Sequence, residues 1–124
     1  MAIISFSPDT LIDYIPTYGG NRDSDNPCIV KLKFVPFSKV QVYSRMITAK
    51  TKGLMDTKKI TEATQEIQRK QFIESVESIS GFVCEGKEVT TPTEFYDLAP
   101  SSLIYELIGA MEDSQKISEG QKKI

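Results

Sequence analysis

One stretch constrains the fold of this chain more than any other: "CIVKLKFVP", at residues 28–36. Three apolar residues in it alternate with lysines, in the order Val30, Lys31, Leu32, Lys33 and Phe34. An extended chain with this pattern turns its apolar side chains toward a core and its lysines toward water. A strand with one wet face is typical of an antiparallel sheet or a sheet edge. The stretch therefore predicts a strand of that kind, which ends at Pro36.

The segment after this strand predicts a helix over about residues 39–49, although its valines favour a strand. Ser38 and Gln41 have the spacing of a capping box, and Phe37 is placed to pack against Val42 as a hydrophobic staple. The residues that would then share the buried face are Val40, Tyr43, Met46 and Ile47. We give the start signals more weight than the strand propensity.

The longest predicted helix runs from an N-cap at Asp56 to a stop at Gly81. Its apolar stripe is not straight. Residues of the first half share one face: Ile60, Ala63 and Ile67. Residues of the second half lie on a face rotated by well over a quarter turn: Phe72, Ile73, Val76 and Ile79. Either the helix kinks near Arg69, or its two halves pack against different bodies.

Turn and cap signals organise the rest of the chain. A hairpin is expected with its turn at Glu85-Gly86-Lys87. Thr91, Pro92 and Glu94 mark the start of a short helix. Another helix opens at Pro100 and carries a broad apolar stripe, formed by Leu103, Ile104, Leu107, Ile108 and Met111.

These elements predict an α+β fold: a small antiparallel sheet from N-terminal strands and the hairpin near Gly86, packed with three to four helices. A mainly α domain with one hairpin is the alternative. At 124 residues the chain is expected to form a single domain. Residues 1–26 form a partly irregular N-terminal segment, in which "AIISFSP" reads as a strand or extended arm. Residues 115–124 are predicted to be a flexible tail, because only Ile117 and Ile124 there are large and apolar.

Several functional classes are disfavoured by what the sequence lacks. It has no histidine, which is the commonest general base and metal ligand. Cys28 and Cys84 fit no metal or redox spacing and predict two half-buried thiols. There is no phosphate-binding loop or nucleophile elbow, and the carboxylate pairs look like solvated helix faces. We expect no enzyme, with no catalytic, cofactor-binding or metal-ligating residues. No leader or membrane-length apolar run is evident, so we expect a cytoplasmic protein.

Charge is unevenly distributed along the chain. Residues 31–70 hold ten basic and three acidic residues, a net charge of +7, while the rest holds five basic and fourteen acidic ones, a net charge of −9. The positive and negative segments can lie side by side on a solvated surface of one molecule. They can also attract oppositely charged surfaces of other copies of the chain or of partner proteins. They can also indicate nucleic-acid binding by the basic segment. We expect a homo-oligomer and regard nucleic acid as the less favoured partner.

Three stretches carry a resemblance to a known family. They are "RKQFIESVESISGFVCEGKEVTTPTEFYD", "SSLIYELIGAMEDSQKI" and the closing "ISEGQKKI"; "VKLKFVPFSKVQVY" adds a strand-then-helix segment. Together they resemble the small tail assembly chaperones of long-tailed bacteriophages and prophages. The resemblance covers about two-thirds of the chain and includes no catalytic group. The N-terminal stretch through Asn26 has no counterpart in it.

The resemblance implies a non-enzymatic adaptor that binds the tape-measure protein during tail assembly, with the tail tube protein as a further candidate partner. It also implies that a ribosomal frameshift near Lys122-Lys123 could produce a longer product. A two-faced helix suits the holding of another helix in a groove. The candidate partner-binding residues are Ile60, Ala63, Ile67, Phe72, Ile73 and Val76. The alternatives are a small nucleic-acid-binding or regulatory protein and a structural head–tail or tail subunit.

Overall fold

The computed structural model describes residues 2–3, 6–8 and 10–121. Its main sheet has three antiparallel strands in the order β1-β2-β3. The bounds of these strands are Leu11–Tyr14, Ile29–Lys33 and Val76–Ser80. The strand that the lysine alternation predicted is β2, and it is the central strand of the sheet, antiparallel to both neighbours. The α+β class is confirmed, although the described residues form five α-helices and one 3-10 segment where three to four helices were expected.

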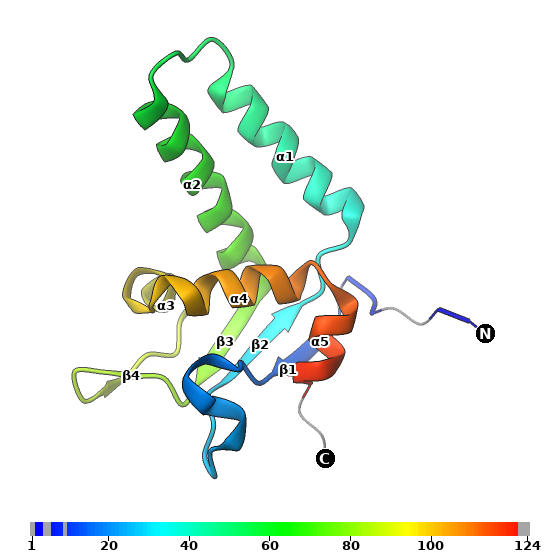
Figure 1. Ribbon diagram of the computed structural model, residues 1–124, viewed down its shortest axis with the longest axis vertical. Coiled ribbons are helices and arrows are strands. Elements are labelled where there is room, and N and C mark those ends of the chain that lie inside the picture. The colour runs from blue at the N-terminus through cyan, green and yellow to red at the C-terminus, as the bar shows by residue number, and fades with distance from the viewer. Residues whose placement is uncertain (1, 4–5, 9, 122–124) are drawn as a thin grey trace.

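One face of this sheet is apolar and buried. Cross-strand partners place six side chains there: Ile12, Tyr14, Val30, Leu32, Val76 and Ile79. All six are at most 3% exposed, because helices cover this face. The helices are α3 (Pro92–Leu98), α4 (Ser101–Met111) and α5 (Ser114–Gly120). In Figure 1, α4 crosses in front of the sheet, and its buried residues join the same core cluster.

Two further helices leave this body as an arm. They are α1 (Phe37–Thr51) and α2 (Thr57–Ser75), which pack against each other. Figure 1 shows the pair projecting away from the sheet, with the connecting loop at the far tip. Since β2 and β3 are neighbours in the sheet, the whole arm occupies the place of a simple turn between two paired strands. We call α1, α2 and their loop the arm, and the rest of the fold the body.

The predicted hairpin forms, but apart from the main sheet. Val83–Cys84 (β4) pairs with Lys87–Glu88 (β5) across a two-residue turn at Glu85-Gly86. Both turn residues have positive φ, 52° and 77°, which is the signature of a type I′ turn. We expected this hairpin to belong to the central sheet; instead the third strand of that sheet is β3.

The expectation of one helix from Asp56 to Gly81 is wrong in its second part. The N-cap is confirmed, since the Asp56 side chain accepts a hydrogen bond of 2.9 Å from the Lys58 N–H. However, the helix ends at Ser75, and Val76 continues directly as β3. Gly81 instead ends that strand with φ 78°, and a Cβ there would lie 3.0 Å from the Cys28 backbone.

A β-bulge explains why β3 looked helical. Val76 pairs with Leu32, whereas Ser78 pairs with Lys31, so Glu77 is an extra residue on β3. The bulge puts Val76 and Ile79 on the same face although they are three residues apart, which is a helical spacing. A bulge is set by pairing with β2, so the local pattern could not reveal it.

The expected flexible tail is also wrong over Gln115–Gln121. Asp113 caps α5 by accepting a hydrogen bond of 3.0 Å from the Gln115 N–H, and Ile117 is fully buried. The Ile15 N–H donates to the Gly120 carbonyl at 2.7 Å, and Tyr14 forms a bridge with Gln121. A single buried isoleucine and sheet-edge hydrogen bonds therefore hold this polar helix. Residues 122–124, including the lysine pair considered for frameshifting, lie outside the described residues.

Smaller boundary differences have local causes. Helix α1 begins at Phe37, two residues earlier than expected, with Pro36 at the N-cap and no side-chain cap. Phe37 is 73% exposed, so the predicted staple does not form. The stretch from Ala2 to Pro8 forms no strand at the residues described there. The first strand lies instead at Leu11–Tyr14, ahead of a 3-10 segment, η1 (Tyr18–Asp23). The caps of α3 are as predicted, with the Glu94 N–H donating to Thr91 Oγ1.

Candidate partner-binding site

The predicted partner-binding residues separate into two groups. Ile60, Ala63 and Ile67 share the face of α2 that meets α1, where Ile67 lines a hollow with Met46 and Ala49. Phe72, beyond them, faces the body, 5.9 Å from Phe95 and 5.3 Å from Tyr96 between ring centroids. The first half of the stripe therefore packs against α1 and the second half packs against the body. This agrees with the prediction that the two halves have different packing partners.

Burial limits what these residues can offer to a partner. Ile67 is 4% exposed, Phe72 is fully buried and Val76 is 3% exposed, so these three side chains serve the core. Ile60, Ala63 and Ile73 are half-buried. Two hollowed surfaces along the arm offer more exposed side chains than this stripe does.

The first such surface is the groove between α2 and the α3–α4 side of the body, which we call the α2–α4 groove. It has a volume of about 500 Å³, within the range of ligand-binding clefts. Its apolar lining includes Tyr96, Ala99, Ile104, Tyr105 and Ile108, and its rim on α2 carries Glu62, Glu66 and Arg69. Tyr105 is 63% exposed, an unusual position for a large aromatic ring beside half-buried Ile108. The groove combines an aromatic floor with charges of both signs.

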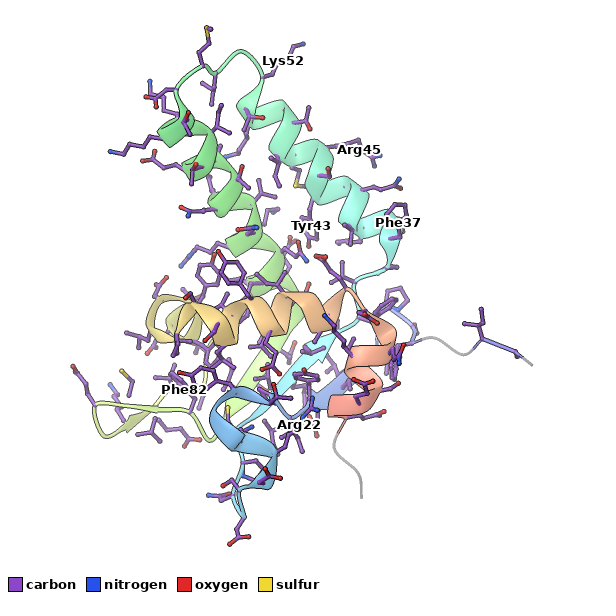
Figure 2. All side chains as sticks on the ribbon, viewed as in Figure 1. Arg22, Phe37, Tyr43, Arg45, Lys52 and Phe82 are labelled. Carbon is purple, nitrogen blue, oxygen red and sulfur yellow. The ribbon has the colours of Figure 1, made fainter. Side chains whose placement is uncertain are left out.

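The second surface lies at the base of the arm, on the other helix, and we call it the α1 cleft. It has a volume of about 620 Å³. Its cations are Lys33 from the end of β2 and Lys39 and Arg45 from α1. Among the described residues that line it, the one carboxylate is Glu74. Figure 2 shows Arg45 and Phe37 on the outer side of α1, whereas Tyr43 points inward toward α2.

Two polar contacts brace α1 against α2. The Tyr43 hydroxyl donates to Glu74 Oε1 at 3.1 Å, and Lys50 Nζ pairs with Glu66 Oε1 at 2.8 Å. Burial, followed by the hydrogen bond to Glu74, raises the pKa of Tyr43 to about 12. Its phenol is therefore a neutral donor at physiological pH, and it fixes one side of the α1 cleft.

A carboxylate on α4 holds the N-terminal part of the body. The Glu106 side chain accepts hydrogen bonds from the Tyr14 hydroxyl (2.8 Å), from the Thr17 N–H (2.7 Å) and hydroxyl (2.9 Å), and from the Tyr18 N–H (3.2 Å). Burial and the adjacent carboxylate raise the pKa of Tyr14. Because every contact is satisfied within the chain, we assign this network to the stability of the body.

The two cysteines are half-buried free thiols, as expected. Burial raises the pKa of Cys28 to about 11, which keeps its thiol protonated and poorly nucleophilic at neutral pH. Within residues 2–3, 6–8 and 10–121, no group of three His, Cys, Asp or Glu side chains is placed to hold a metal ion. Over the same part of the chain, no helix is long and apolar enough to cross a membrane.

Sequence reasoning missed the residues that line these two surfaces. Tyr105 lies next to the buried stripe of α4, so only its size distinguished it. Lys33, Lys39 and Arg45 belonged to the +7 segment, but their approach to one cleft depends on how β2 leads into α1. The sequence showed that this segment is basic, but it could not show which of the basic side chains line the same cleft.

Comparison of the chain with protein-family models, with curated proteins and with solved structures gave no match. The fold and its surfaces therefore define the class on their own: an α+β body with a projecting helical-hairpin arm.

Proposed function

We propose that this chain is a non-enzymatic tail assembly chaperone of a phage or prophage. In this role it binds a helical segment of the tape-measure protein in the host cytoplasm. The proposal combines the family resemblance of the sequence with one structural observation, the α2–α4 groove with its exposed aromatic ring.

The groove suits a helix as its occupant. Two helices form its walls, and the apolar side chains between them are those that a third helix would cover. Tyr105 and Ile108 are one helical turn apart on α4, so they present a continuous ridge to an incoming helix. Aromatic side chains of this kind are frequent anchors of protein interfaces.

The test is co-expression with the long tape-measure reading frame of the same phage or prophage, followed by co-purification through a tag on this chain. We expect a stable complex that Tyr105→Arg together with Ile108→Asp reduces at least tenfold. Phe37→Ser is the matched control, since it changes an exposed aromatic residue outside the groove. A complex that survives the groove variant unchanged would reject the site, and the absence of any complex would reject the partner.

The same system separates a chaperone from a structural subunit. A chaperone leaves before the tail is complete, so mass spectrometry of purified virions should not detect this chain. A head–tail or tail subunit would be present at a fixed copy number per particle.

The basic arm favours one second candidate function, nucleic-acid binding. Residues 37–75 hold eight basic and four acidic residues, a net charge of +4, and Lys52, Lys58 and Lys59 lie near the tip. A DNA titration at several salt concentrations tests it. Tight binding near 0.15 M salt, with a slope that reports several phosphate contacts, would favour this candidate over the chaperone.

A further inference from the structure

The α1 cleft gathers positive charge from three of the described residues. Lys33, Lys39 and Arg45 line it, and none of the three forms an ion pair within the described residues. Lys39 instead lies 5.9 Å from the centre of the Tyr43 ring. The Glu74 carboxylate, which also lines the cleft, is already engaged by the Tyr43 hydroxyl at 3.1 Å and by Lys70 at 3.8 Å. The cleft therefore presents three cations to any ligand that enters it.

Apolar side chains lie between these cations. Phe34, Val35, Pro36 and Val42 line the same cleft, and Phe34 and Val42 are only half-buried. One turn further along α1, Met46 and Ala49 line the adjoining hollow of about 420 Å³ against Ile67. Val42 and Met46 are four residues apart, as are Arg45 and Ala49, so the two hollows follow the same side of α1. The result is an elongated apolar track with a basic edge.

An apolar track with a basic edge selects its ligand by two features together. Nucleic acid would use the cations, but base stacking needs exposed aromatic faces, and of the aromatic residues that line the cleft Phe34 is half-buried and Tyr43 is buried. An amphipathic peptide uses both, with its apolar stripe on the floor and its carboxylates opposite the cations. The length of the track along α1 matches several turns of a helix rather than a compact small molecule.

We propose that the α1 cleft and the adjoining hollow bind an acidic amphipathic segment of a partner protein. Its apolar stripe lies on Phe34, Val42 and Met46, and its Asp or Glu side chains pair with Lys33, Lys39 and Arg45. The α1 cleft shares no lining residue with the α2–α4 groove, and the adjoining hollow shares only Glu66 with it among the described residues. The inference does not rest on the proposed function.

The test uses synthetic probes in a fluorescence anisotropy titration at about 0.15 M salt. One probe is an 18-residue helical peptide with leucines at helical spacing flanked by glutamates, and the second replaces every glutamate with lysine. A 20-nucleotide single-stranded DNA is the third probe. We expect the glutamate peptide to bind at least tenfold more tightly than the lysine peptide or the DNA.

Matched charge reversals locate the binding. Lys39→Glu with Arg45→Glu should weaken the glutamate peptide at least tenfold. Lys58→Glu with Lys59→Glu makes the same change of charge on exposed residues that do not line the cleft, so it should change binding less than threefold. Val42→Asp, checked for helicity by circular dichroism, should weaken binding because it removes an apolar contact and leaves the cations of the cleft in place.

Three results would overturn the proposal. The first is equal binding of the glutamate and lysine peptides. The second is tighter binding of the DNA with equal loss in both charge-reversal pairs, which would assign the arm to nucleic acid. The third is dissociation of a homo-oligomer by Lys39→Glu with Arg45→Glu when neither peptide binds, which would make a second copy the occupant. The Tyr105→Arg, Ile108→Asp groove variant should bind the glutamate peptide normally, which separates this site from the proposed chaperone site.

Discussion

The body and the arm are stabilised in different ways. The body buries a sheet face under α3, α4 and α5, and most of the fully buried side chains lie there. On the arm, only Tyr43 in α1 and a group at the base of α2 are buried, and the two helices are braced by a hydrogen bond and an ion pair. The arm depends on packing between two helices with polar outer faces, so changes at its exposed positions should leave the body folded. The chain therefore combines a body with a buried core and an arm whose outer helix faces are available for contact.

The residue that joins the two regions should have the largest effect. Phe72 is fully buried and contacts Phe95 and Tyr96 where α2 enters the body. We expect Phe72→Ala to lower the free energy of unfolding by about 3–5 kcal/mol in a urea titration. Phe37→Ala, at a 73% exposed position on the arm, should change it by less than about 0.5 kcal/mol. Equal effects of the two changes would contradict the burial of Phe72 where α2 enters the body.

Two glycines test whether the C-terminal helix belongs to the body. A Cβ at Gly120 would overlap the ring of Tyr14, whereas at Gly109 the nearest atom would be Lys116 Nζ at 3.7 Å. We expect Gly120→Ala to destabilise the protein by about 1–3 kcal/mol through overpacking. Gly109→Ala should be neutral or stabilising by up to about 1 kcal/mol through helix propensity.

Thermal unfolding of these two variants gives opposite signs if α5 is docked. Removal of residues 118–124 should lower the midpoint of thermal unfolding, as Gly120→Ala does, because it deletes the Gly120 carbonyl that accepts a hydrogen bond from the Ile15 N–H. An unchanged midpoint in the truncated chain would instead support the flexible tail that composition alone predicted.

The hydrogen bond within the arm should matter less, and its effect should depend on pH. Tyr43→Phe removes the donor to Glu74 and should cost about 1 kcal/mol at pH 7. The pKa of Tyr43 is raised from 10.0 to about 12 in the folded protein, so folding favours its neutral form. Its contribution is fully present below about pH 10 and is lost as pH rises toward 12.

The measurement for Tyr43 is the difference in unfolding free energy between the wild type and Tyr43→Phe at pH 7 and at about pH 10.5. We expect the difference to shrink at the higher pH. Because both proteins contain Cys28 and Tyr14, the titration of those groups cancels. A difference that grows with pH would reverse the assigned sign.

The smallest expected effect is that of the exposed ion pair on the arm. Lys50 and Glu66 have side-chain exposures of 45% and 65%, so water screens their attraction. Lys50→Gln should cost at most about 0.5 kcal/mol, and a double-mutant cycle with Glu66→Gln measures the coupling. A coupling above about 1 kcal/mol would mean that the arm is held more tightly than its burial implies.

Several signals that depend on near neighbours were read correctly from the sequence, although the capping box at Ser38 and the staple at Phe37 did not form. The alternation around Leu32 predicted β2, the Thr91-Pro92 start predicted α3, and the stripe through Leu107 predicted α4. The Gly86 turn also formed where it was expected. In each case the determining contacts lie within a few residues, which is the range over which propensity and capping act.

The candidate site was predicted only in part. The basic segment and the two-faced helix were recognised, but three of the six candidate residues are buried, and the exposed Tyr105 and the cleft residue Lys39 were not singled out. Exposure of a side chain depends on which element covers it, and that element can be distant in sequence. The partner of the α2–α4 groove is a prediction that co-purification tests, and the partner of the α1 cleft is a prediction that the peptide titration tests.

By itself the sequence determined the α+β class, the strand β2, the N-caps of α2 and α3 and the imbalance of charge, because each follows from local pattern or composition. Only the tertiary structure decided that Val76–Ser80 is a bulged strand, that α5 docks through Ile117, and that α1 and α2 stand out as an arm. The physical reason is the same for all three. A bulge, a docked helix and an uncovered face are each set by pairing and burial between distant segments, which can override a local periodicity.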